Sequence, residues 1–175
     1  MSAARFALVI LLATPLLKAQ SDAPDRIDMT GQDAPDVQLV AADGTSVPLS
    51  SYRGKPVLLD FWATWCKPCV ESLPKLAELS KETAPKGIVL LGVDEDREDK
   101  KASDFLAGHN YSWPNTHDDG SIHEAFNRVG LPLIVLIDAQ GKVVYYKGGE
   151  DDYGLRAAIA ALGPQYASLA PAPKP

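Results

Sequence analysis

The chain has 175 residues, with 17 basic and 23 acidic side chains and a formal net charge of −6 at neutral pH. This acidic balance makes the chain a poor candidate for binding nucleic acid or an anionic membrane surface, so we expect neither partner. Apolar residues make up 46% of the sequence, enough for the core of one globular domain.

The first 19 residues predict an export signal. Arg5 supplies a positive charge, residues 6–17 are mostly apolar, and Leu17-Lys18-Ala19 is a passable cleavage site. The apolar run is short for a membrane span and contains Pro15, so an uncleaved membrane anchor is the less favoured alternative. We therefore expect a periplasmic or otherwise extracytoplasmic protein, in a compartment where disulfides persist.

Residues 20–30 are polar and without periodicity, which predicts a linker before a folded domain over residues 31–163. Two short alternating runs, Val37/Leu39 and Val47/Leu49, flank the turn signal Asp43-Gly44. This pattern predicts a β-hairpin ahead of the core.

The centre of the chain predicts a βαβ unit. Residues 56–62 and 88–93 are unbroken apolar runs, typical of parallel strands that are covered on both faces, and residues 66–83 have helical periodicity. The acidic run 94–101 predicts a solvated loop leading into an exposed helix, not a metal site. The three histidines (His109, His117 and His123) share no ligand spacing, and we expect them at the surface.

The C-terminal third predicts a helix, a hairpin and a second helix. Residues 121–124 resemble a capping box that starts a helix ending at Gly130. Residues 131–138 and 142–146 predict paired strands around a turn. The last helix places its apolar residues over 155–162, and the Ala/Pro-rich residues 164–175 predict a disordered tail.

The only two cysteines, Cys66 and Cys69, lie two residues apart where a buried strand meets a helix. The N–H groups and positive dipole end of that helix favour a thiolate at Cys66. Cys69 is one turn along the helix, close enough to close a disulfide. The spacing predicts a redox pair in which one thiol attacks and the other resolves.

Other uses of the pair are weaker. Structural zinc wants four ligands, and the sequence has no second cysteine pair or closely spaced histidines. Covalent haem attachment requires a histidine where Val70 stands. A static disulfide remains open, although so small a ring restricts the unfolded chain very little.

The segment Asp-Phe-Trp-Ala-Thr-Trp-Cys-Lys-Pro-Cys, which ends at Cys69, resembles the active-site segment of thioredoxin-fold proteins. The wider pattern, from about Gly31 to about Leu162, resembles exported thiol–disulfide oxidoreductases of the TlpA/ResA type. The resemblance implies an α/β fold: a thioredoxin-like three-layer α/β/α sandwich with a mixed central sheet and an added N-terminal β-hairpin. Gly130-Leu131-Pro132 is similar to the loop that carries a cis-proline facing the cysteines, with Leu133 in place of the family's frequent small or hydroxylated residue.

The resemblance also implies roles for site residues. Cys66 becomes the exposed nucleophile and Cys69 the buried resolving thiol. Lys67 favours the Cys66 thiolate and so an oxidant, whereas Pro68 matches strongly reducing thioredoxins, so we expect an intermediate potential. Trp65 is expected to contact partners together with Lys67, Pro68 and Leu131, and Pro132 to complete the site.

Asp60 ends the first core strand at the position of the buried acid of thioredoxin. Burial there raises its pKa towards neutrality and makes it a usable proton acceptor for Cys69. Closer relatives commonly carry Asn at this position and Glu three residues after the second cysteine, where this chain has Ser72, with Glu71 one residue early. The acid is therefore expected at Asp60.

The favoured interpretation is an exported enzyme that exchanges dithiols and disulfides with client proteins, as a reductant of, for example, apocytochrome cysteines. The resemblance implies recharging by a membrane thiol electron donor. A general oxidant of exported proteins and a Cu(I) metallochaperone are the alternatives. We expect a monomer without cofactor or metal.

Overall fold

The computed structural model describes residues 28–41, 43–98, 100–128 and 130–173. The predicted export signal lies outside the described residues, as does most of the predicted linker. Among the described residues, no helix combines the length and apolar character needed to cross a membrane.

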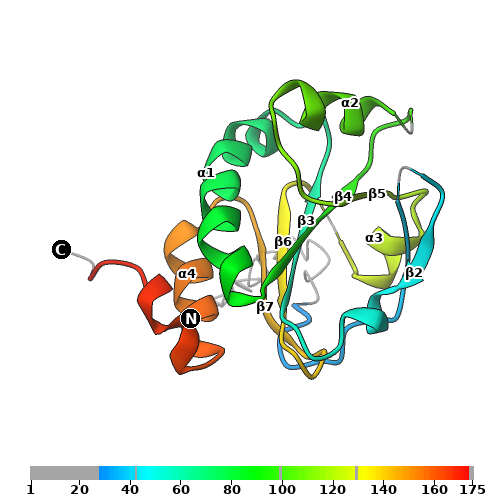
Figure 1. The fold of residues 1–175 in the computed structure, drawn as a ribbon. Helices are drawn as coiled ribbons and strands as arrows, with labels where there is room; N and C mark the ends of the chain where they lie inside the picture. The colour runs from blue at the N-terminus through cyan, green and yellow to red at the C-terminus, as the bar shows by residue number, and fades with distance from the viewer. Residues whose placement is uncertain (1–27, 42, 99, 129, 174–175) are drawn as a thin grey trace, which may run out of the picture.

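A five-stranded mixed sheet in the order β5-β4-β3-β6-β7 forms the centre of the fold (Figure 1). Strand β3 pairs parallel with β4 and antiparallel with β6, β4 pairs parallel with β5, and β6 pairs antiparallel with β7. The strands are β3 (Val57–Trp62), β4 (Val89–Asp94), β5 (Asn115–His117), β6 (Leu133–Ile137) and β7 (Val143–Gly148). The predicted βαβ unit and C-terminal hairpin are confirmed.

The α-helices are α1 (Lys67–Thr83), α2 (Lys101–Gly108), α3 (Ser121–Ala125) and α4 (Asp152–Ala161), with 3₁₀ turns η1 (Leu49–Tyr52), η2 (Ala84–Lys86) and η3 (Pro164–Leu169). Side chains from α1, α2, α4 and η3 form one core cluster with Leu58 and Trp62 of β3. Phe61 of β3 packs in the second cluster, with Phe126 beyond α3. The sheet therefore lies between two covering layers, and the expected three-layer sandwich is confirmed.

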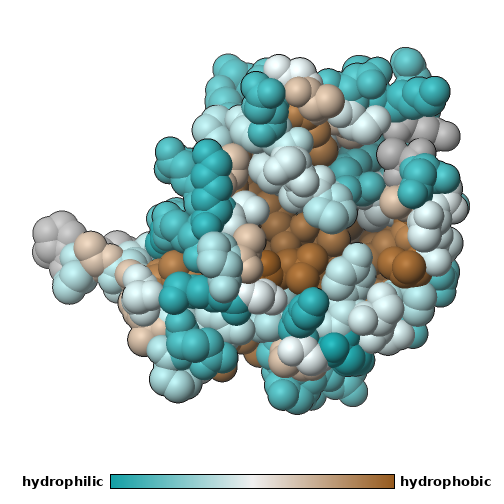
Figure 2. All heavy atoms as spheres, in the orientation of Figure 1, coloured by the Kyte–Doolittle hydropathy of each residue, from teal (hydrophilic) through white to brown (hydrophobic). Residues whose placement is uncertain are grey.

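The predicted N-terminal hairpin is also present. Strands β1 (Gln38–Val40) and β2 (Ser46–Pro48) pair antiparallel in a separate two-stranded sheet. Beside it, a hollow of about 270 Å³ is lined by apolar and polar side chains of the hairpin, β4 and β5. Figure 2 shows apolar surface in the middle of the face turned to the viewer, between α1 and the hairpin.

Packed residues extend past both ends of the predicted domain. Met29 is buried in the second core cluster and the Gly31 N–H bonds the Val143 carbonyl, so the folded domain begins before residue 31. At the other end, η3 occupies part of the segment predicted to be disordered. Tyr166 and Leu169 are each 5% exposed and pack in the first cluster. Alanine and proline dominate this tail, but its two large apolar side chains find a place against the core.

The helix predicted from Ser121 to Gly130 is shorter, and the capping box is absent. Gly120 is the N-cap, and the buried Asp118 carboxylate accepts the N–H groups of Gly120, Ile122 and His123. An acid three residues before the expected cap therefore satisfies the first N–H groups of α3, a role that local spacing did not reveal.

Candidate active site

Cys66 and Cys69 form a disulfide at the N-terminus of α1, with their Cα atoms 5.2 Å apart. Cys66 is the N-cap of this helix, and its Sγ accepts the N–H of Cys69 at 3.3 Å. Cys66 is 5% exposed and Cys69 is 1% exposed in this oxidised state, so Cys66 is the less buried of the two but is not the exposed residue that was expected. A partner that reaches the disulfide must approach from the side of Cys66.

The two tryptophans near Cys66 in the sequence differ sharply in exposure. Trp65 is 61% exposed, whereas Trp62 is fully buried and donates its indole N–H to Asn115 Oδ1 at 3.0 Å. Trp65 is therefore the exposed tryptophan of the two and Trp62 the packed one, as expected. Lys67 is highly exposed and lies 3.7 Å from Glu71, so its charge is screened by solvent and by this ion pair.

Asp60 does not end its strand as expected but lies within β3, two residues before Trp62, and is 2% exposed. Successive strand residues face opposite sides of a sheet, so Asp60 shares its face with Leu58 and Trp62, which pack in the cluster that holds both cysteines. Its Oδ2 atom is buried without a hydrogen-bond partner, and burial raises the pKa of Asp60 to about 7. The carboxyl is therefore able to hold or release a proton near neutral pH.

The loop before β6 carries the expected cis-proline. The Leu131–Pro132 peptide bond is cis, and Pro132 lines a cavity of about 320 Å³ together with Pro68 of α1. The cavity therefore lies between the start of α1, which carries the cysteines, and this loop. Its lining residues are Pro68, Gly130, Leu131, Pro132, Leu133, Tyr146, Gly148 and Gly149. The four predicted contact residues split between this cavity (Pro68, Leu131) and the exposed rim near the cysteines (Trp65, Lys67).

The expectation of a solvated acidic loop was wrong for its first three residues. Asp94 and Asp96 are buried, and Glu95 is 11% exposed in an ion pair with Arg128. Asp94 Oδ2 accepts a hydrogen bond from Asn115, and its Oδ1 lies 3.1 Å from His117 Nδ1, so His117 is not the simple surface residue that was expected. Burial raises the pKa of Asp94, an effect that the bonds from His117 and Asn115 oppose.

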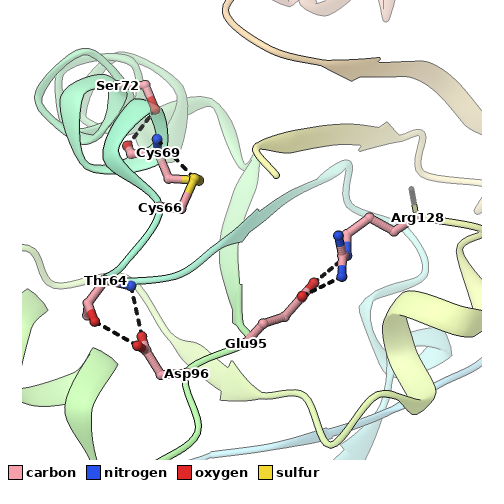
Figure 3. Close-up of a disulfide and its surroundings, with 7 residues drawn as sticks. All are labelled: Thr64, Cys66, Cys69, Ser72, Glu95, Asp96 and Arg128. Carbon is pink, nitrogen blue, oxygen red and sulfur yellow. Dashed lines mark hydrogen bonds and ion pairs between the residues drawn. A yellow bond between two sulfur atoms is a disulfide. The ribbon is translucent and has the colours of Figure 1, made fainter. Parts of the chain in front are cut away.

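These three acids extend the carboxyl end of β4, next to the end of β3 that leads into the cysteine turn. Functional sites in α/β folds commonly lie at the carboxyl ends of parallel strands, and this rule could have indicated that these acids lie near the cysteines. Desolvation also raises the pKa of Glu95, against the opposing charge of Arg128. In Figure 3, the Thr64–Asp96 pair lies below the disulfide, and the Glu95–Arg128 pair lies below and to the right of it.

A redox-active disulfide at a helix start, beside a cis-proline loop on a central mixed sheet, agrees with comparisons to known proteins. The model of the Redoxin family matches residues 29–162. The chain belongs to the Redoxin family. The matched range starts at the buried Met29 and ends next to the last residue of α4.

The most similar members include named thiol–disulfide oxidoreductases. ResA of Bacillus thuringiensis subsp. konkukian is 33% identical over 69% of this chain and 70% of that protein. ResA of Oceanobacillus iheyensis is 31% identical over 78% of this chain and 74% of that protein. This Redoxin-family protein is accordingly a thiol–disulfide oxidoreductase whose reactive pair is Cys66 and Cys69.

Solved structures agree with the fold. A Chlorobium tepidum protein assigned as thiol:disulfide interchange protein DsbE superposes with a TM-score of 0.70 at 34% identity, over 77% of this chain and 98% of that one. The thioredoxin domain of a Bacteroides vulgatus thiol-disulfide oxidoreductase gives 0.64 at 30% identity, over 70% and 90% of the two chains. Both matches place this member of the family on the thioredoxin fold.

Proposed function

We propose that the protein is an exported reductant that exchanges its Cys66–Cys69 dithiol with disulfides of client proteins. The observation that carries the direction of exchange is the buried Asp60 carboxyl on the cysteine face of β3, with its pKa near 7. A carboxylate near the cysteines disfavours thiolates, and destabilising the thiolate form makes a dithiol a stronger reductant. The screened charge of Lys67 contributes little in the opposite direction.

The exchange proceeds in two displacements. The Cys66 thiolate attacks one sulfur of the client disulfide, forming a mixed disulfide and releasing the other client sulfur as a thiolate, which takes up a proton. Asp60 then takes the proton of Cys69, whose thiolate attacks Cys66 Sγ and expels the second client sulfur as a thiolate. This thiolate takes up a proton, and Asp60 releases the one that it took. The client gains two electrons and two protons, and the protein is left as the Cys66–Cys69 disulfide. A membrane thiol donor returns it to the dithiol form.

Client placement follows from the surface around the disulfide. Trp65 offers an exposed aromatic face, and the cavity between Pro68 and Pro132 offers an apolar floor. The backbone of Leu131 is available to pair with an extended client segment beside the sulfurs. Apocytochromes with cysteine pairs are the client class suggested by the TlpA/ResA resemblance.

The standard redox potential tests the proposed direction. Reference values are about −270 mV for thioredoxin and about −120 mV for the oxidant DsbA. We expect equilibration with glutathione to place this protein between them and nearer to thioredoxin. A value close to that of DsbA would instead assign the protein as a general oxidant, and Cu(I) titration of the reduced protein tests the metallochaperone alternative.

Clients can be identified by trapping. Cys69→Ser retains the attacking thiol and lacks the resolving one, so mixed disulfides should accumulate on Cys66 in the native host. Cys66→Ser is the matched control because it cannot form them. Recovery of the trapped species outside the cytoplasm, with cysteine-pair proteins attached, is the result expected for an exported reductant.

A further inference from the structure

The turn that delivers Cys66 to the start of α1 is held at its centre. The N–H of Cys66 donates to the Ala63 carbonyl at 3.1 Å, which makes Thr64 and Trp65 the central residues of a β-turn. Thr64 donates its backbone N–H to Asp96 Oδ2 at 2.9 Å and its hydroxyl to Asp96 Oδ1 at 2.6 Å (Figure 3). Both oxygens of one carboxylate are thus used on one residue of this turn.

Asp96 is itself fixed. Its side chain is fully buried, its backbone N–H donates to Asp94 Oδ1 at 3.3 Å, and Lys101 Nζ lies 3.9 Å from its Oδ1. A buried carboxylate with charge-assisted hydrogen bonds holds its partner more rigidly than a solvated one. The position of Thr64 therefore depends on the end of β4.

The preceding acid holds a second loop. The backbone N–H of Glu95 donates to the Trp62 carbonyl at 3.0 Å, and its carboxylate pairs with the Arg128 guanidinium (Figure 3). Both side chains are nearly buried, at 11% and 13% exposure. Arg128 lies two residues before Gly130, where the chain enters the loop that carries Pro132.

We propose that Glu95 and Asp96 are a pair of positioning residues that fix the cysteine turn and the entry to the cis-proline loop relative to each other. Consecutive Cα atoms are about 3.8 Å apart, so two loops held by consecutive residues cannot shift independently. Neither carboxylate touches the reacting sulfurs; Asp96 acts on Cys66 through Thr64, and Glu95 acts on client binding through Arg128. The inference rests on exchange at Cys66 and Cys69, and it does not depend on the direction of electron flow.

The link from Asp96 through Thr64 to Cys66 is tested by the reactivity of Cys66. Reduced variants are alkylated with limiting iodoacetamide over a range of pH, and the label on Cys66 is measured by mass spectrometry. Thr64→Val keeps the shape and removes the hydroxyl, so Cys66 is held less well at the helix start and its thiolate loses stabilisation. We expect alkylation at pH 7 to slow by about 3–10-fold, as a shift of up to one pH unit in its midpoint implies.

Two further variants separate position from charge. Thr64→Ser restores the hydroxyl and should alkylate within about twofold of the wild type. Asp96→Asn should slow alkylation as Thr64→Val does. The variant that combines the two substitutions should be no slower than the slower single variant, because both substitutions remove the same interaction. If Asp96 acted only by its negative charge, Asp96→Asn would speed alkylation and Thr64→Val would have no effect, which contradicts the proposal.

The link from Glu95 through Arg128 to client binding is tested by substrate kinetics, with dithiothreitol as reductant and insulin as the disulfide substrate. Arg128→Met should raise KM for insulin several-fold, leave kcat within about twofold, and leave Cys66 alkylation unchanged. Arg128→Lys keeps the charge but not the two parallel donors of the guanidinium, so its KM should lie between those of the wild type and Arg128→Met. Arg97→Met is the matched control, since Arg97 is exposed in the loop that follows the two acids.

A purely structural role gives a different result. Thermal unfolding of all variants is measured alongside. If they unfold at lower temperature but keep wild-type alkylation profiles and wild-type KM, the two acids do not position the site and the proposal is overturned. An oxidising potential of the wild type would overturn the proposed reductant function alone and leave these comparisons valid.

Discussion

The backbone N–H of Cys69 donates to Cys66 Sγ at 3.3 Å, within the first turn of α1. A helix N-terminal N–H stabilises a thiolate at this sulfur once the disulfide is reduced. The same turn buries Cys69 on the core side of the helix, at 1% exposure. The two sulfurs thus lie in different surroundings, as the proposed roles of attacking and resolving thiol require.

We therefore predict that limiting iodoacetamide labels Cys66 of the reduced protein before Cys69. Cys66→Ser should abolish exchange with a protein disulfide, and Cys69→Ser should form mixed disulfides that it does not resolve. Peptide mapping of the alkylated protein and gel analysis without reductant provide the measurements. Equal labelling of the two cysteines would contradict the assigned roles.

Asp60→Asn should stabilise the oxidised protein in a way that depends on pH. Burial raises the pKa of Asp60 from 3.8 to about 7, so between these values the folded protein holds a proton that the unfolded chain has lost. The free energy of unfolding of the wild type therefore falls as the pH rises through this window, and is lowest above it. The advantage of Asn should grow from about pH 4 to about pH 7 and then level off.

The limit of this advantage is about 4 kcal/mol, which corresponds to the difference between 3.8 and about 7. The buried amide of Asn costs part of it, about 1–3 kcal/mol if its groups are unpaired. Urea unfolding at pH 4.5, 6 and 7.5 measures the trend. A difference between variant and wild type that is independent of pH would show that Asp60 does not titrate in this range.

The same substitution should slow catalysis. Asp60→Asn removes the proton acceptor that we propose for Cys69, and general base help is typically worth about 10²–10⁴-fold. Stopped-flow exchange at neutral pH should show a loss of this order. Glu71→Gln is the matched control, because Glu71 is exposed and pairs with Lys67 at 3.7 Å. An Asp60→Asn enzyme that exchanges at the wild-type rate would assign the proton to another group.

Trp65→Ala should weaken client binding with little effect on stability. Its side chain is 61% exposed, so its loss leaves no large cavity. An interface tryptophan is commonly worth about 1–2 kcal/mol, which predicts a KM for insulin raised by roughly 5–30-fold. Tyr153→Ala on α4, which removes another exposed aromatic, serves as the control and should leave KM unchanged.

Removal of the last residues should destabilise the domain. Tyr166 and Leu169 of η3 pack in the cluster that also holds both cysteines. Leu169→Ala should cost about 2–5 kcal/mol of unfolding free energy, and truncation after Gly163 should cost at least as much. Denaturant unfolding measures both. Ser168→Ala, which changes an exposed residue of the same turn, should have a negligible effect.

Local sequence was sufficient for the strands and helices that surround the cysteines. The apolar runs that became β3 and β4 are buried on both faces of the sheet, so their pattern is continuous and easily recognised. The apolar residues on both sides of Asp60 in the sequence, together with its match to the buried acid of thioredoxin, were also enough to expect that it is buried. These features depend on neighbours within a few residues. The redox pair was likewise expected from the short spacing between Cys66 and Cys69.

Tertiary structure alone decided which distant groups lie beside the cysteine turn. Asp94, Glu95 and Asp96 form an acidic run typical of a solvated loop, yet β4 ends beside the cysteine turn and buries them against Thr64, Arg128 and Asn115. The partners of Asp96 and Glu95 lie 32 and 33 residues away in the chain. A charged run is buried only when the folded chain supplies matching donors, and no local pattern states whether it will. Met29 and Tyr166 were missed for the same reason, because each is a single large side chain in a polar or Ala/Pro-rich segment whose burial is decided by the shape of the core it meets.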